Sequence, residues 1–240
     1  MLFGKKISLV IPAHNEAEGL DHLLRDTPDY LDEIVIVDNN CTDDTAAVCR
    51  GFGCRVVVEP KQGYGAALKA GFRAATGEII MTMDADGTCL FEGYRRMIKH
   101  LVENDLDFIT GRRVPDRFRT LVSLMRFLGD MFLDIVCWCL FRFWVFDSQS
   151  GLWVFKRELL DRVKLESDGW ALSEEFKIET FTDPEVKTAE LPVLYINVRL
   201  GESKLRMWRD GFANLRFMFS KWRQKQNRGR PPQKAVDFDA

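Results

Sequence analysis

Short apolar runs alternate with helical stretches over the first 110 residues, and this alternation constrains the fold more than any other feature. The apolar runs are Ile7–Ile11, Ile34–Val37, Val56–Val58, Ile79–Met83 and Phe108–Thr110. The helical stretches between them are Glu16–Arg25, Thr45–Gly51, Ala66–Ala75 and Glu92–Glu103. Val- and Ile-rich runs separated by helices are typical of a parallel sheet covered on both faces. The sequence therefore predicts an α/β chain with a mostly parallel sheet.

The composition excludes disordered and membrane-spanning classes. Forty-six per cent of the residues are hydrophobic, which is more than a disordered chain contains. The longest uncharged apolar run, Ile135–Phe141, is far shorter than the ~20 residues of a spanning helix.

Six cysteines without a CxxC pair indicate a reducing compartment. The first residues lack the apolar segment of a secretory signal peptide.

The second half of the chain contains a different pattern. Apolar residues recur there at steps of three and four, which predicts one apolar face of a helix. These residues are Leu121, Leu124, Met125, Leu128, Met131, Phe132, Ile135 and Cys139. Further elements are predicted at Leu152–Phe155 (strand), Arg157–Val163 and Ser173–Phe181 (helices), Val193–Val198 (strand) and Met207–Trp222 (helix).

The net charge of −2 conceals an uneven distribution. From Lys204 to Ala240 the chain has ten Lys or Arg and three Asp, a net charge of +7, so that residues 1–203 carry −9. Such asymmetry indicates an anionic partner at the basic end. The segment Met207–Arg228 also contains Trp and Phe, and basic amphipathic helices of this kind lie in the plane of a membrane surface. The alternative is that this helix packs on the sheet or on a partner subunit. We expect the anionic partner to be a membrane surface and no nucleic acid to bind.

Polar side chains follow three of the predicted strands. Asp84-Ala85-Asp86 comes directly after the fourth run, Asp38 ends the second, and Pro12-Ala13-His14-Asn15-Glu16 follows the first. Ligands of open α/β sheets bind at the carboxyl ends of strands. Two carboxylates there suit Mg²⁺ or Mn²⁺, which can bridge a diphosphate leaving group. The alternative for Asp84 and Asp86 is an acidic surface turn.

The segment Lys61-Gln62-Gly63-Tyr64-Gly65 begins like a dinucleotide fingerprint, but Leu68 occupies the position of the third glycine. A dinucleotide-binding dehydrogenase is therefore disfavoured, and no GxxxxGK[ST] phosphate loop is present in the sequence. The glycines would let the backbone approach either a nucleotide or a neighbouring strand.

The order of these motifs resembles that of family 2 glycosyltransferases with the Rossmann-like GT-A fold. Downstream motifs are similar to those of dolichyl-phosphate mannose synthases and other polyprenyl-phosphate glycosyltransferases: Thr110-Gly111-Arg112-Arg113, Asp147-Ser148-Gln149-Ser150-Gly151 and Arg199-Leu200-Gly201-Glu202-Ser203-Lys204-Leu205. The resemblance covers residues 7–205. It implies a GT-A domain at 1–205 with an inserted amphipathic interface helix at 119–146. A basic amphipathic helix at 206–223 and a flexible tail at 224–240 follow.

The resemblance implies a role for each matching residue. The nucleotide would be bound by Pro12, Glu16, Asp38, Lys69, Asp84 and Asp86. The cofactor would be Mg²⁺ or Mn²⁺, held by Asp84 and Asp86. The catalytic residues would be Asp86, Asp147 and Gln149. The acceptor phosphate would be bound by Arg113, Arg126, Arg199, Ser203 and Lys204. One departure is Asn39, because many members have a second acidic residue after the one that Asp38 matches.

The implied reaction moves a hexose from a UDP- or GDP-linked donor to an acceptor oxygen with inversion. A hydroxyl acceptor needs a general base, for which Asp147 and Glu175 are candidates. A phosphate monoester needs less help, because its second pKa is about 6 and it is largely a dianion at pH 7. Three functions stay open: transfer to a polyprenyl or dolichyl phosphate, transfer to a glycan hydroxyl, and an inactive nucleotide-sugar-binding membrane scaffold.

A polyprenyl acceptor lies in a bilayer, so we expect a peripheral protein on the cytoplasmic face of a membrane. The apolar stretch Leu121–Phe146 is interrupted by charged residues, and it would pack on the core, on a partner subunit or on lipid. Formation of a homo-oligomer therefore also stays open.

Overall fold

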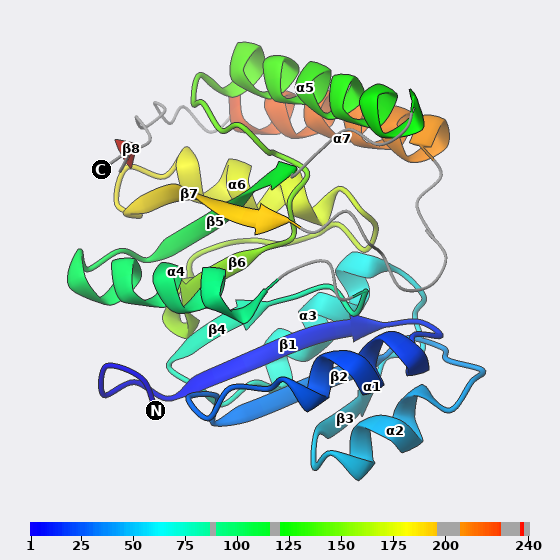
Figure 1. The fold of residues 1–240 in the computed structure, drawn as a ribbon. Coiled ribbons are helices and arrows are strands. Elements are labelled where there is room, and N and C mark those ends of the chain that lie inside the picture. The colour runs from blue at the N-terminus through cyan, green and yellow to red at the C-terminus, as the bar shows by residue number, and fades with distance from the viewer. Residues whose placement is uncertain (87–89, 116–120, 196–206, 227–235, 238–240) are drawn as a thin grey trace.

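Eight strands form one sheet in the described part of the chain, with the order β3-β2-β1-β4-β6-β5-β7-β8 (Figure 1). The computed structural model describes residues 1–86, 90–115, 121–195, 207–226 and 236–237. The strands are β1 (Ile7–Ala13), β2 (Glu33–Asp38), β3 (Arg55–Val58), β4 (Ile79–Thr82), β5 (Phe108–Pro115), β6 (Trp153–Lys156), β7 (Thr188–Tyr195) and β8 (Val236–Asp237). Only β6 runs antiparallel to its neighbours in this part of the chain. The predicted α/β class with a mostly parallel sheet is confirmed.

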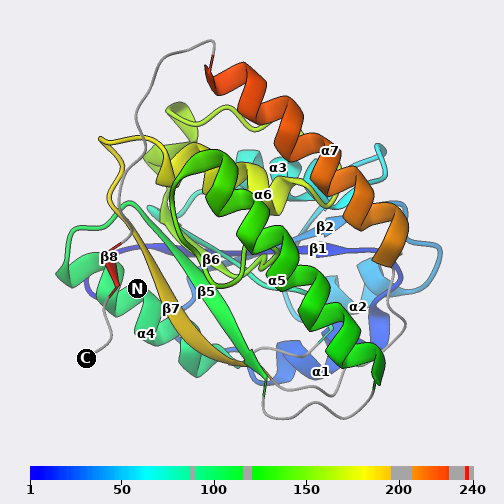
Figure 2. The ribbon, with the colours of Figure 1, turned by 90° about the horizontal axis from the view of Figure 1, so that it is seen from above.

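Helices cover both faces of the sheet. They are α1 (Ala17–Arg25), α2 (Thr45–Gly51), α3 (Tyr64–Ala74), α4 (Phe91–Glu103), α5 (Leu121–Phe141), α6 (Leu172–Phe181) and α7 (Met207–Gln226), with a 3₁₀ turn at Arg157–Asp161. One apolar core lies between the sheet and α1, α2 and α4. A second core lies on the other face under α3 and α6, and buried residues of α5 and α7 extend it. Helices α5 and α7 lie at one end of the molecule (Figure 1), and the view from above shows them side by side (Figure 2).

Two predicted boundaries differ from the structure. The last predicted strand, Val193–Val198, begins earlier, at Thr188, because Ala189, Leu191 and Val193 alternate into the core. It is described as far as Tyr195, and residues 196–198 lie outside the described part of the chain. The final helix continues to Gln226, so the first three residues of the predicted flexible tail are helical. Within the same tail, Val236 and Asp237 pair in parallel with β7. The remaining tail residues lie outside the described part of the chain.

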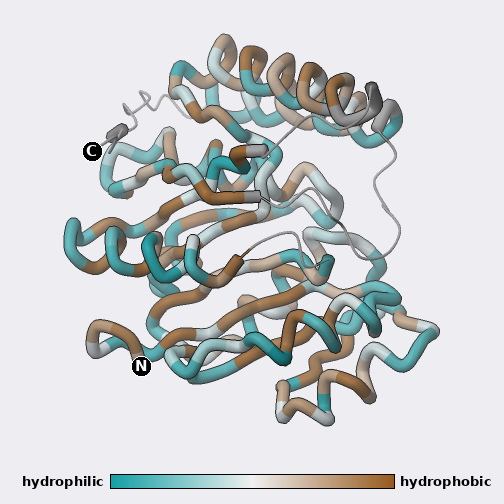
Figure 3. Tube along the Cα trace, in the orientation of Figure 1, coloured by the Kyte–Doolittle hydropathy of each residue, from teal (hydrophilic) through white to brown (hydrophobic). Residues whose placement is uncertain are grey.

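Helix α5 turns its polar stripe toward the protein and its apolar face outward. Asp130 is half-buried and Asp134 is buried, whereas Phe132 and Leu128 are 54% and 47% exposed. The tube coloured by hydropathy shows apolar residues along this outer helix (Figure 3). Of the three open alternatives, the described side chains of the predicted apolar face do not pack on the core, whereas Leu133, Cys137 and Phe141 of the same helix do. A partner subunit and lipid stay as the alternatives for this surface.

No helix in the described part of the chain is both long enough and apolar enough to cross a bilayer.

Buried charges join α6 to α7. The Lys221 ammonium lies 2.8 Å from a Glu175 carboxylate oxygen and 2.7 Å from one of Glu179, and the Lys221 side chain is only 3% exposed. Lys225 binds the other Glu179 oxygen at 2.9 Å. Two basic residues of the helix predicted to face a membrane are thus turned toward the protein. Glu175, a candidate base, is engaged in the same contact.

We expect Lys221→Met to lower the free energy of unfolding by about 3–5 kcal/mol, because removing one partner leaves buried carboxylates without compensation. Urea denaturation at pH 7 measures this change. Lys99→Met removes an exposed pair with Glu103 and is the matched control, with an expected change below about 0.5 kcal/mol. Equal effects of the two substitutions would contradict the structural role of Lys221.

Candidate functional site

A cavity of about 1000 Å³ lies where the carboxyl ends of β1, β2 and β4 meet α5 and α7. The sequence-predicted residues that line it are Pro12, Glu16, Asp84, Asp86, Arg113 and Gln149. Parallel pairing of β1 with both β2 and β4 brings these strand ends to one edge. Other lining residues come from β2 and its loop (Asn39), from α3 (Tyr64), from the loop before α6 (Trp170), and from α7 (Arg209 and Asn214).

The turn with the two acidic residues is built against α1. A methyl group on Gly19 would lie 2.5 Å from the Ala85 carbonyl oxygen, so the helix backbone touches the turn between Asp84 and Asp86. The Tyr64 hydroxyl donates to Asp84 at 3.3 Å. Burial, followed by the Asp84 charge, holds the pKa of Tyr64 well above its usual value, which keeps this donor protonated. The alternative of a solvated acidic surface turn is therefore disfavoured, since Asp86 is 5% exposed.

Asn39 organises the loop around the cavity. Its side-chain nitrogen donates to the Glu59 and Lys61 carbonyls at 2.9 and 2.8 Å, and its side-chain oxygen accepts the Gly63 N–H at 2.8 Å. A carboxylate could not donate to the two carbonyls, which explains the departure from two acidic residues at this point. The neighbouring Asp38 does not line the cavity, and it accepts the Cys41 N–H at 2.8 Å.

The glycines before α3 allow a close contact with a loop. Methyl groups on Gly63 and Gly65 would lie 2.3 and 2.5 Å from the carbonyl oxygens of Asp168 and Ser167. The approaching backbone is that of the loop before α6 and not a neighbouring strand. Gly63 also lines the cavity, so approach to a nucleotide stays a prediction. Lys69 binds the same loop through Asp168 at 2.9 Å and does not line the cavity.

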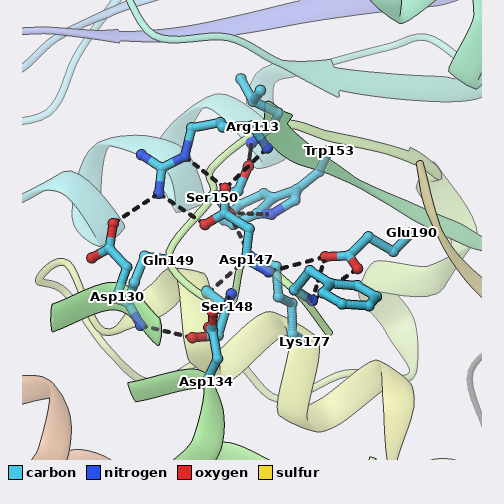
Figure 4. A network of polar contacts seen from close by, with 12 residues as sticks. Arg113, Asp130, Asp134, Asp147, Ser148, Gln149, Ser150, Trp153, Lys177 and Glu190 are labelled. Atoms are coloured by element: carbon cyan, nitrogen blue, oxygen red, sulfur yellow. Dashed lines mark hydrogen bonds and ion pairs between the residues drawn. The ribbon is translucent and has the colours of Figure 1, made fainter. Parts of the chain in front are cut away.

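Arg113 and Asp147 form a bidentate ion pair beside the cavity (Figure 4). The Arg113 guanidinium donates to the two Asp147 carboxylate oxygens at 2.7 and 2.8 Å. A carboxylate oxygen of Asp130 lies 3.6 Å from a guanidinium nitrogen of Arg113. Burial alone would raise the pKa of Asp147, but Arg113 holds it below its usual value. A carboxylate with a lowered pKa is a weak base.

Gln149 is oriented by contacts on both ends of its amide. Its nitrogen donates to the Ser148 hydroxyl at 2.9 Å and to Glu174 at 2.7 Å, and its oxygen accepts from Asn214 at 2.8 Å. Both N–H groups are used, so Gln149 can meet a ligand only as an acceptor.

Glu174 is a buried carboxyl group behind Gln149. Burial raises its pKa to about 8, against the lowering effects of Gln149 and Lys177. One of its oxygens has no hydrogen-bond partner among the described residues. Both observations indicate a protonated side chain at neutral pH.

Four predicted phosphate-binding residues are not placed by the structure. Arg199, Ser203 and Lys204 lie outside the described residues, and only the backbone of Arg126, within α5, is described.

Conversely, sequence reasoning missed the stacked pair of Tyr64 and Trp170, whose ring centroids are 4.6 Å apart. Tyr64 lies in the glycine motif, but no motif marks Trp170, because the loop before α6 has no pattern of its own.

Comparisons with known proteins give a consistent relationship. The family model described as "Glycosyl transferase family 2" matches residues 8–163. An uncharacterized glycosyltransferase of Mycobacterium tuberculosis is 42% identical over 47% of this chain and 50% of its own length, so the match spans half of that relative. A dolichyl-phosphate hexose transferase of Haloferax volcanii is 28% identical over 86% of this chain and 90% of its own.

A solved structure shares the fold. It is glucosyl-3-phosphoglycerate synthase from Mycobacterium tuberculosis in complex with Mn²⁺, UDP and glucosyl-3-phosphoglycerate. The TM-score is 0.68 at 22% identity, with 90% of this chain and 80% of the other covered.

We expect Glu174→Gln to flatten the pH dependence of stability. A raised pKa in the folded state stabilises the fold below the unfolded value, and this stabilisation is lost as the pH rises toward about 8. Glu174 should therefore lower the free energy of unfolding by up to about 1.4 kcal/mol per pH unit between these values.

Urea denaturation of both proteins at pH 5, 6.5 and 8 measures this slope. Asp134 and Glu190 also have raised pKa values, but they are common to both proteins and cancel in the difference. Parallel curves for the two proteins would show that Glu174 is ionised throughout.

Proposed function

Since the chain belongs to glycosyltransferase family 2, we propose that it transfers a hexose from a nucleotide sugar to a polyprenyl phosphate at a membrane surface. The donor is linked to UDP or GDP, and the transfer inverts the anomeric carbon. The observation that supports this acceptor most directly is the state of the two candidate bases.

Neither candidate base suits a hydroxyl acceptor. Asp147 is paired with Arg113 and has a lowered pKa. Glu175 is 0% exposed, accepts the Glu166 and Ser167 N–H groups and pairs with Lys221. A phosphate monoester is largely a dianion at pH 7, because its second pKa is about 6, and attacks without a strong base. The name of the Haloferax volcanii relative is in keeping with a lipid-phosphate acceptor.

The donor would bind over the acidic turn. Asp84 and Asp86 would hold Mg²⁺ or Mn²⁺ together with the donor diphosphate, since Mg²⁺ is commonly bound by one or two carboxylates plus substrate phosphates. The two carboxylates fit such an arrangement, because both line the cavity and Asp86 is only 5% exposed. When bound, the metal neutralises the leaving diphosphate. Pro12 and Glu16, across the same cavity, would contact the base and ribose.

The remaining residues would orient the reacting groups. Gln149 would accept a hydrogen bond from the donor sugar through its side-chain oxygen. Arg113 would attract the acceptor phosphate, since a guanidinium also bonds two phosphate oxygens at once. Asp147 would hold Arg113 in position. Asp38 and Lys69 would act on the donor only indirectly, through the loops that they fix.

Two helix surfaces would dock on the membrane. The outer face of α5 carries exposed apolar side chains that include Phe127, Leu128, Met131, Phe132, Ile135 and Trp138. Exposed residues of α7 alternate between basic and aromatic at steps of three and four, in Arg209, Phe212, Arg216, Phe219 and Arg223. Apolar side chains beside exposed arginines suit an interface with anionic lipid headgroups.

Transfer is tested with labelled UDP- and GDP-sugars, Mg²⁺ or Mn²⁺, and dolichyl phosphate. We expect a lipid-linked product with the wild-type protein. The rate of its formation should fall by about 100-fold or more with Asp84→Asn, because a ligand of the metal is removed. Asp29→Asn changes an exposed carboxylate outside the cavity and should keep full activity. A product formed only with a soluble glycan would indicate a hydroxyl acceptor. Retained donor binding without turnover in any assay would indicate a scaffold.

Docking is tested by flotation with vesicles containing anionic phospholipid. We expect the double variant Leu128→Glu/Phe132→Glu to bind at least about tenfold more weakly, because each side chain loses roughly 1.5–3 kcal/mol of apolar burial. Added salt should weaken binding further. Phe52→Glu is the control, because it alters an exposed aromatic residue directly after α2, and α2 lies at the opposite end of the molecule from α5 (Figure 1). Unchanged flotation, with a dimer that the double variant abolishes, would assign the α5 face to a second copy of the chain.

A further inference from the structure

The segment between α5 and β6 is held by charged side chains from three different elements. The N–H groups of Phe146 and Asp147 donate to Glu190 of β7 at 2.8 and 3.1 Å. The Ser148 N–H donates to Asp134 of α5 at 2.7 Å. Lys177 of α6 supplies the third contact (Figure 4). The side chains of Asp147 and Gln149 therefore project from a backbone that is fixed at several consecutive peptide units.

Lys177 binds the backbone on both sides of Gln149. Its ammonium donates to the Ser148 carbonyl at 3.0 Å and to the Ser150 carbonyl. The Ser150 carbonyl also accepts from the Trp153 indole, and the Lys177 ammonium lies 5.7 Å from the centre of the Trp153 ring. Lys177 is 0% exposed. Such contacts constrain the carbonyls before and after Gln149 and leave its side chain to face Asn214 and the cavity.

A buried ammonium is an expensive way to fill this space. Transfer of an unpaired charge from water to the interior is strongly unfavourable, and apolar residues often replace buried ion pairs without loss of stability. Without the ammonium, the buried Ser148 carbonyl would lose the donor that α6 supplies, and the Ser150 carbonyl would keep only the Trp153 indole. The chemistry of the contact therefore points to a role in fixing the segment, beyond packing.

We infer that Lys177 is a positioning residue, which holds the 146–150 segment so that Gln149 and Asp147 are presented to the cavity in one orientation. The inference concerns the site of the proposed function, and its consequence for turnover rests on that function. Its consequence for the backbone does not, which allows the two to be tested separately.

The backbone is tested by amide hydrogen exchange of Lys177→Met. We expect exchange in residues 146–150 to accelerate by roughly 10- to 100-fold, because the segment loses its hydrogen bonds to a charged group. Exchange in α4, on the other face of the sheet, should be unchanged. Ile178→Ala removes apolar volume from the same helix but no hydrogen bond, and it is the control for lost stability. If Lys177→Met does not fold, Lys177→Gln, which keeps an uncharged donor group, takes its place with a smaller expected effect.

Turnover is tested in the same proteins with dolichyl phosphate and the active donor. We expect kcat to fall by roughly 10²-fold in Lys177→Met, since small misplacements of reacting groups have effects of that size. The KM of the donor should stay within about threefold, because Asp84 and Asp86 are untouched. Unchanged exchange in 146–150, or an equal loss of kcat in Ile178→Ala at equal melting temperature, would overturn the inference. Accelerated exchange without any transfer by the wild-type protein would overturn only the proposed function.

A pH profile separates Lys177 from its neighbours. Burial lowers the pKa of Lys177 to about 8, although Asp147 and Glu190 counter this effect. The groups that face it are Asp134, Cys137, Asp147, Glu174, Glu190 and Arg113. Glu174 has a pKa of about 8 as well, so a decline of kcat near this pH has two candidate origins. Lys177→Arg, which stays charged, should move the decline to higher pH only if Lys177 is the origin. An unmoved decline in a folded, active Lys177→Arg protein would contradict a need for the charge.

Discussion

Parallel pairing of β1 with β2 on one side and β4 on the other is the constraint on which the whole site depends. It places the ends of three strands at one edge of the sheet, so that residues far apart in the sequence line one cavity. Gly19 and Asn39 then refine this arrangement. One lets α1 touch the turn between the two carboxylates, and the other fixes the neighbouring loop.

Helix α5 connects this edge to the outside of the molecule. Its inner stripe contributes Asp130 near Arg113 and Asp134 on the Ser148 N–H, and its outer face is apolar and exposed. One helix therefore takes part in both the polar network beside the cavity and the surface proposed to dock on lipid. Buried charged side chains of α6 hold two neighbouring parts of the site. Lys177 binds the 146–150 segment, and Glu175 pairs with Lys221 of α7.

Sequence patterns predicted the elements of the first half well, because each strand is a short apolar run whose signal is local, although β3 at the edge of the sheet is only partly buried. The start of β7 was missed, since Pro192 and Glu190 interrupt its apolar pattern while Ala189, Leu191 and Val193 are buried. Within the site, the acidic turn was recognisable from Asp84 and Asp86 in sequence. The support from Tyr64 and Trp170 was not, because stacking across two loops has no local signature.

The sequence alone determined the α/β class, the order of the family motifs and the presence of an apolar helix with charged interruptions. These properties depend on local periodicity and on residue type, which a chain displays before it folds. Only the tertiary structure decided which partners those residues meet. It paired Arg113 with Asp147 and turned the apolar face of α5 outward. It also engaged Lys69, Lys221 and Glu175 in ion pairs or hydrogen bonds with other parts of the protein. Burial and pairing set the charge state and reach of each group, and both arise from contacts between segments that are distant in the chain.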